Sequence, residues 1–175
     1  MDEANRFAPP ATSVADVGPD VVQPVRLWPP SGRIGRLRFL AYGLALYVLF
    51  IVAAFVFGFV SARVGKDSVL MSALGMLGFL AYLVAAFVLI VQRSHDMDMS
   101  GWWSIAAIIP IVGLVWVFRG GTRGANRWGP PPPPNGVFVT IAGLLLPVIV
   151  VVGIVAAVAL PAYQQAAMRG TAGSR

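Results

Sequence analysis

Four apolar stretches of this chain contain no charged residue, and they limit the folds that are open to it. Three of them, residues 39–62, 69–91 and 137–160, are long, and the third in chain order, residues 102–118, is shorter. A helix of about 20 apolar residues crosses the roughly 30 Å hydrocarbon core of a bilayer. Inside a bilayer the backbone must satisfy its own hydrogen bonds, which favours helices. We therefore predict an all-α, polytopic membrane protein with four hydrophobic segments.

Composition excludes an ordinary soluble fold. Hydrophobic residues make up 58% of the 175 residues and charged residues only 11%, whereas soluble domains have about 25% charged residues. The net charge of +6 comes from basic residues that flank the apolar runs. This placement favours orientation and contact with lipid headgroups over nucleic-acid binding. The absence of cysteine excludes disulfides, thiolate metal sites and cysteine nucleophiles.

Proline-rich polar segments separate and precede the apolar runs. Residues 1–30 are polar, lack helical periodicity and do not resemble a cleavable signal peptide. We divide the chain into a disordered cytoplasmic tail (1–30), a membrane domain (31–131, with helices at about 39–62, 69–91 and 102–118), a proline-rich linker end with a fourth membrane helix (132–160), and a short basic tail (161–175).

Basic residues near the first helix predict the orientation of the chain. Arg63 and Lys66 follow this helix, whereas a larger group precedes it: Arg26, Arg33, Arg36 and Arg38. Because arginine and lysine accumulate on the cytoplasmic side of membrane helices, we predict a cytoplasmic N-terminus and a multi-pass protein of the bacterial inner (plasma) membrane.

The third segment allows two topologies. It has only about seventeen residues, the lower limit for a span, and Pro110 and Gly113 interrupt it. Its tryptophans, Trp102, Trp103 and Trp116, are expected at the headgroup level. We prefer a Pro-kinked crossing as the simpler topology, which places both termini inside. A re-entrant segment would instead keep the following arginines inside and leave the C-terminus outside, in better agreement with the positive-inside rule, but its broken helix needs shielding by other helices.

Three polar motifs flank these segments in a fixed order. They are Gly32-Arg33-Ile34-Gly35-Arg36, then Arg93-Ser94-His95-Asp96 leading to Ser100-Gly101-Trp102-Trp103, and finally Gly121-Thr122-Arg123-Gly124-Ala125-Asn126-Arg127-Trp128-Gly129-Pro130. Together with Pro110 and Gly113, they resemble the small bacterial inner-membrane proteins grouped as domain of unknown function 805, over about residues 31–131. The resemblance implies a compact membrane domain of three or four helices without an established biochemical role.

The motifs supply the candidate site residues, which are Arg33, Arg36, Arg93, His95, Asp96, Trp102, Asn126, Arg127 and Gly129. His95, Asp96 and Asp98 form the only acid–base cluster near the membrane and could act as a general base or metal ligands. The chain has no second histidine for a zinc site, and Met97 and Met99 are more typical of apolar filler than of a copper site. We therefore predict no catalytic, cofactor-binding or metal-binding residue and no enzyme. Asp96 is expected either to accept hydrogen bonds from backbone N–H groups at the start of the next helix or to pair with Arg93 or another motif arginine.

The arginines before the first helix have two possible roles. In the first, an anionic headgroup or the side chains of Asp96 and Asp98 bind to Arg33, Arg36 and Arg38. In the second, these arginines serve only to orient the helix. In the re-entrant topology all three motifs would face the cytoplasm and could form one polar cap. In the crossing topology the third motif lies on the other side and cannot join them.

The last helix is similar over Gly153–Gln164 to the N-terminal helix of type IV pilins. It lacks the leader glycine and the acidic residue of pilins, because Val139 and Leu144 stand at those positions. We predict a non-enzymatic membrane protein that acts through contacts with anionic lipids, a membrane-protein partner or a second copy of itself, and that binds no nucleic acid or cofactor. An accessory role in transport, secretion or type IV pilus assembly is the alternative, although coupled transport is disfavoured because no apolar run contains a charge.

Overall fold

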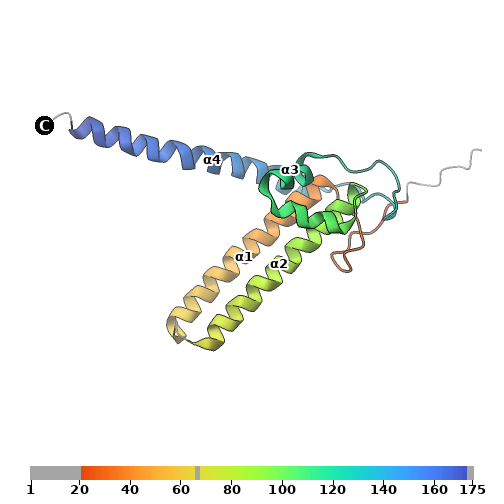
Figure 1. The fold of residues 1–175 in the computed structure, drawn as a ribbon, viewed down its shortest axis with the longest axis horizontal. Helices are drawn as coiled ribbons and strands as arrows, with labels where there is room; N and C mark the ends of the chain where they lie inside the picture. The colour runs from red at the N-terminus through yellow and green to blue at the C-terminus, as the bar shows by residue number, and fades with distance from the viewer. Residues whose placement is uncertain (1–20, 66–67, 173–175) are drawn as a thin grey trace, which may run out of the picture.

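The structure, a computed structural model, describes residues 21–65 and 68–172, and its regular elements within these ranges are all helical. In chain order they are α1 (Arg36–Val64), α2 (Val69–Asp96), the 3₁₀-helix η1 (Gly101–Ile108), α3 (Pro110–Phe118) and α4 (Val137–Ala172) (Figure 1). Three of these helices are long and apolar enough to cross a membrane. The all-α prediction, with three long apolar helices and a shorter interrupted one, is confirmed.

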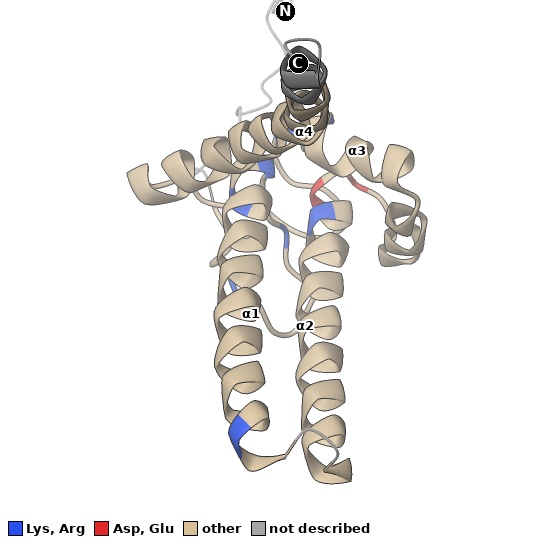
Figure 2. Ribbon diagram, turned by 90° about the vertical axis from the view of Figure 1, so that its left-hand side faces the viewer, with Lys and Arg blue, Asp and Glu red and all other residues tan. Residues whose placement is uncertain are grey.

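Helices α1 and α2 form an antiparallel hairpin (Figures 1 and 2). Their contact includes Phe50, whose ring stacks on that of Tyr82 with 4.3 Å between centroids. Large apolar side chains such as Phe55 and Val69 point outward and are exposed. An apolar outer surface is what a bilayer-spanning hairpin requires, because lipid tails take the place of a protein core.

The polar ends of the hairpin are more helical than the apolar runs predict. The sequence predicts that the second helix ends near residue 91, but α2 continues to Asp96. The side chains from Gln92 to Asp96 are buried, so this last turn is stabilised by packing and hydrogen bonds that hydropathy does not reveal. The first helix likewise begins at Arg36, ahead of the predicted residue 39.

The third segment is broken into two short helices that fold back toward α2, an arrangement that fits the re-entrant alternative better than the preferred crossing prediction. Helix η1 ends at Ile108, Ile109 is extended, and α3 begins at Pro110. Both halves return to Ser94 at the end of α2, since its Oγ lies 3.1 Å from Ser104 Oγ and accepts a 2.7 Å bond from Trp116 Nε1.

Local chemistry explains the break. Pro110 has no N–H to donate to the preceding turn, and it stands at the start of α3, where a helix does not need that donor. A Cβ on Gly113 would lie 3.0 Å from the carbonyl oxygen of Ala107, so the glycine lets α3 pack closely against η1.

Helix α4 starts beside the first turn of α1 and then projects away from the hairpin (Figure 1). At the crossing point a Cβ on Gly143 would lie 2.5 Å from the carbonyl oxygen of Leu37, so the two backbones nearly touch. The helix continues to Ala172, and the prediction that it ends at residue 160 is wrong. Pro161 lies inside the helix, where it removes one backbone hydrogen bond without ending it.

Residues 21–30 run across the end of the hairpin where α1 begins, first as irregular chain over residues 21–26 and then through bends and a turn over residues 27–30. Gln23 N donates to the carbonyl oxygen of Pro131 at 3.1 Å, and Gln92 Nε2 donates to that of Arg26 at 2.7 Å. These bonds connect this stretch to α2 and to the proline-rich loop. Residues 1–20 of the predicted tail and residues 173–175 lie outside the described residues.

Candidate functional site

Charged residues gather at the end of the molecule where α1 begins and α2 ends (Figure 2). Three chain segments meet there: residues 21–36, the last turn of α2 from Gln92 to Asp96, and the loop 119–129 that follows α3. We call these segments together the polar cap. The re-entrant path of η1 and α3 brings the loop 119–129 back to residues 21–36 and to the last turn of α2.

Asp96 lies at the centre of the polar cap between two arginines. Its Oδ1 accepts a 3.2 Å bond from Arg33 Nη2, and its Oδ2 accepts a 2.5 Å bond from Arg93 Nη1. Both arginine side chains are fully buried and the carboxylate is 4% exposed. The predicted pairing of Asp96 with motif arginines is thus present with both Arg93 and Arg33.

Two guanidinium groups share one carboxylate, and backbone carbonyls accept most of their other N–H donors, although Arg33 Nε is buried without a partner. Arg33 donates to the carbonyl oxygens of Thr122, Gly124 and Gly129, each at 2.9 Å. Arg93 donates to those of Trp116, at 3.0 Å, and Arg119. Because a guanidinium presents five donors in a rigid plane, each arginine fixes the course of the loop around it.

The loop that follows α3 is folded tightly onto Asp96. Thr122 donates through both its backbone N and its Oγ1 to the carbonyl oxygen of Asp96, each at 2.8 Å. A Cβ on Gly121 would lie 2.0 Å from Asp96 Oδ2, so only glycine fits there. Gly124 and Gly129 have φ values of +74° and +109°, in the region that favours glycine.

His95 is held by stacking and by its own backbone. Its ring lies 3.7 Å from that of Trp128 with 12° between their planes, and its Nδ1 lies 3.3 Å from the carbonyl oxygen of Gly32. Asn126 Nδ2 donates to the carbonyl oxygen of His95 at 2.9 Å, and its Oδ1 accepts from the backbone N of Trp128. His95 is only 4% exposed. Its contact with Trp128 packs the second motif against the third.

The nine candidate residues therefore divide into three groups. Six share the interior of the polar cap: Arg33, Arg93, His95, Asp96, Asn126 and Gly129. Two lie at its rim, where Arg36 donates to the carbonyl oxygen of Phe118 at 3.1 Å and Arg127 forms an exposed 3.2 Å ion pair with Asp98. Trp102 takes no part in the cap and is 78% exposed.

Sequence reasoning missed several residues that build the site. Trp116, predicted at the headgroup level, is 2% exposed and donates to Ser94. Three others could have been found from the motifs, because Gly121 and Thr122 lie within the third motif and Gln92 directly precedes the second. Ser104 carried none, because a single serine in an apolar run has no distinctive pattern.

Within residues 21–65 and 68–172 no group of three histidine, aspartate or glutamate side chains is placed to hold an ion. Met97 is buried and Met99 accepts a contact from Arg119 through its sulfur, so both methionines contact protein groups beside His95.

A membrane-spanning helical hairpin, a re-entrant segment and a buried arginine–aspartate cap define a small polytopic membrane protein with its polar motifs gathered at one end. The chain belongs to the family described as "Protein of unknown function (DUF805)", whose model matches residues 27–130. The matched region contains the hairpin, the re-entrant segment and the polar cap except residues 21–26, and it ends before α4.

Two relatives from Escherichia coli strain K12 are similar to this chain. "Inner membrane protein YhaH" is 33% identical over 99 residues, which cover 49% of this chain and 78% of the relative. "Inner membrane protein YhaI" is 38% identical over 63 residues, which cover 34% of this chain and 53% of the relative. No solved structure matches the chain. The similarity of the last helix to pilins lies outside the matched region and stays a prediction.

Proposed function

We propose that this chain is a non-enzymatic protein of the bacterial inner membrane whose polar cap faces the cytoplasm and contacts anionic lipid headgroups. One observation carries the proposal: the arginines at this end form two sets. Arg33 and Arg93 are buried and bound by Asp96 and by backbone carbonyls, whereas the rim arginines are exposed. The first set builds the cap, and the second set is accessible to a partner.

The interior of the cap has the properties of a structural centre. Both carboxylate oxygens of Asp96 are occupied by guanidinium groups, and the ring of His95 is covered by Trp128. A general acid or base needs access to a substrate proton, and these side chains are at most 4% exposed. This arrangement supports a non-enzymatic role.

The distribution of charge supports the cytoplasmic orientation. The loop between α1 and α2 is flanked by Arg63 and contains Lys66. Many more basic residues belong to the opposite end, which holds Arg26, Arg33, Arg36, Arg38, Arg93, Arg119, Arg123 and Arg127. The positive-inside rule assigns the end with more arginines to the cytoplasm.

The rim suits an anionic surface. Its exposed arginines are Arg26, Arg36, Arg119, Arg123 and Arg127. Among the described residues the one exposed acid is Asp98, and it pairs with Arg127. An arginine near an anionic membrane surface contributes about 1 kcal/mol of attraction, so the rim as a whole would prefer phosphatidylglycerol or cardiolipin over zwitterionic lipid.

Lipid co-purification tests this proposal. The protein is purified from native membranes in mild detergent, and its bound lipids are compared by mass spectrometry with those of the whole membrane. We expect enrichment of anionic lipids, and a decrease of about fivefold in Arg123→Gln, since one arginine is removed from the rim. Arg63→Gln, at the opposite end of α1, is the matched control and should keep the enrichment.

Equal lipid content in the wild type, Arg123→Gln and the bulk membrane would overturn the proposal. A stoichiometric protein partner in the same preparation would instead favour the accessory role in transport, secretion or pilus assembly.

A further inference from the structure

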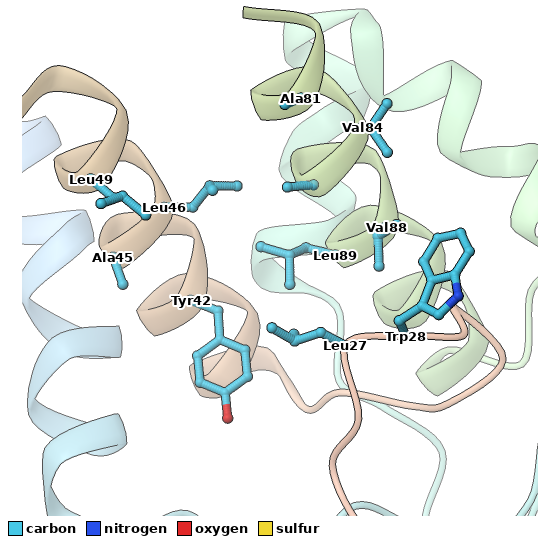
Figure 3. Close-up of a pocket in the computed structure, with 11 residues that line it drawn as sticks. Leu27, Trp28, Tyr42, Ala45, Leu46, Leu49, Ala81, Val84, Val88 and Leu89 are labelled. Carbon is cyan, nitrogen blue, oxygen red and sulfur yellow. The ribbon is translucent and has the colours of Figure 1, made fainter. Parts of the chain in front are cut away.

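An apolar groove lies between α1 and α2 next to the polar cap (Figure 3). Its volume is about 630 Å³, within the range of roughly 300–1,000 Å³ typical of small-molecule sites. The space exists because small side chains, Ala45 on α1 and Ala81 and Ala85 on α2, face it where larger residues would close the hairpin. The groove is therefore a gap between two membrane helices.

The cap end of the groove is closed by the chain that precedes α1. In Figure 3 the side chain of Leu27 lies between those of Tyr42 and Leu89, and Trp28 lies beside Val88 of α2. Gln92, which is fully buried, donates through Nε2 to the carbonyl oxygens of Arg26, at 2.7 Å, and Leu27, at 3.2 Å. Closure of the groove is thus fixed by hydrogen bonds to α2.

Position and charge indicate what fills the groove. It lies within the apolar runs of two membrane helices, where the surrounding solvent is hydrocarbon. A water molecule would find almost no hydrogen-bond partner on this lining. At the closed end, Arg26 is exposed and directly precedes Leu27, while the exposed acid of the described chain, Asp98, is paired with Arg127. The matching ligand has an apolar tail and a negative head.

We propose that the groove holds one acyl chain of an anionic phospholipid whose phosphate lies against Arg26. A transmembrane helix of another protein does not fit as well, because Leu27 and Trp28 block a continuous helix at the cap end. The indole of Trp28, which is 72% exposed, lies where amphipathic rings meet lipid headgroups. The inference rests on the proposed function, since it assigns one of the anionic lipids at the cap to a defined site.

Photo-crosslinking in nanodiscs tests the site. The full chain is reconstituted with trace phosphatidylglycerol carrying a diazirine in one acyl chain, and the labelled residues are mapped by peptide mass spectrometry. We expect labels concentrated on the groove faces of α1 and α2, around Ala45 and Ala85, above those at the outward-facing Phe55. Phosphatidylcholine with the same chain should label the groove about fivefold less, because it lacks the net negative charge that Arg26 attracts.

Matched variants test the binding of the acyl chain and of the phosphate separately. Ala85→Leu fills the groove and should abolish its labelling, whereas Ala73→Leu, at an exposed alanine of the same helix outside the groove, should not. Arg26→Gln should make the two lipids label equally, whereas Arg63→Gln should keep the preference.

Even labelling of all lipid-facing residues, or labelling unaffected by Ala85→Leu, would overturn the inference, as would equal labelling of the groove by both lipids in the wild type. Crosslinks from the groove to a second copy of the chain would also overturn it. If anionic lipids still co-purify in these cases, the proposed function stands without this site. If they do not, both proposals fail.

Discussion

At the scale of residues, the polar cap contains one buried carboxylate, that of Asp96, for two buried guanidinium groups. Five backbone carbonyls accept further donors of these groups, three from Arg33 and two from Arg93. Each arginine therefore binds a different part of the chain. Arg33 donates hydrogen bonds to the loop after α3, and Arg93 donates to the end of α3. The carboxylate of Asp96 binds both arginines, so its loss should affect the whole cap.

Asp96→Asn should lower the free energy of unfolding by about 3–5 kcal/mol, because it leaves two buried guanidinium groups without a counter-charge. The measurement is unfolding by SDS titration in mixed micelles. Asp98→Asn removes the other aspartate of the same motif, whose pair with Arg127 is exposed, and should cost less than about 1 kcal/mol. Equal effects of the two variants would contradict the central role of Asp96.

Gly121→Ala should destabilise the cap by about 1–3 kcal/mol, because the new methyl group would lie 2.0 Å from Asp96 Oδ2 and would displace the loop. Gly120→Ala is the control, since a Cβ there meets nothing within 4 Å. The same SDS titration compares the two variants. A harmless Gly121→Ala would show that the loop does not lie against the carboxylate.

At the scale of elements, hydropathy predicted α1, α2 and the apolar part of α4, because a long uncharged run has few alternatives to a membrane helix. It did not decide the path of the third segment, since a run of about seventeen residues is at the limit for crossing and local propensity permits both topologies. The outcome depends on contacts distant in sequence, namely those of Ser94 with Ser104 and Trp116. Pairing of Asp96 with a motif arginine was predictable from charge, but the carbonyl partners of these arginines required the loop's conformation.

Ser94→Ala should therefore loosen the re-entrant segment. Trp116 Nε1 would lose its acceptor in a buried site, which costs about 1–3 kcal/mol. Ser61→Ala is the control, because Ser61 Oγ bonds only to a carbonyl of its own helix. The measurement is hydrogen exchange by mass spectrometry in detergent, with faster exchange expected over residues 101–118 in Ser94→Ala alone. Unchanged exchange there would mean that Ser94 does not hold the segment.

At the scale of the whole molecule, the re-entrant segment determines how many times the chain crosses the membrane. If α1, α2 and the apolar part of α4 are its spans, we expect the chain to cross an odd number of times, with residues 22 and 163 on opposite sides. All three motifs then share the cap side, as their hydrogen bonds require. A crossing third segment would add one span and bring both ends to the same side.

Single cysteines distinguish these topologies, because the chain has no cysteine of its own. We introduce them at Val22, Val69, Ala125 and Tyr163, and treat spheroplasts with a membrane-impermeant maleimide. In the proposed orientation Val69→Cys and Tyr163→Cys react from outside, whereas Val22→Cys and Ala125→Cys react only after the membrane is permeabilised. The crossing topology exchanges Ala125 and Tyr163 but leaves Val22 and Val69 unchanged, so these two are internal controls. Labelling of Ala125→Cys from outside would contradict the polar cap, because residues 119–129 would then be separated by the bilayer from Arg33 and Asp96.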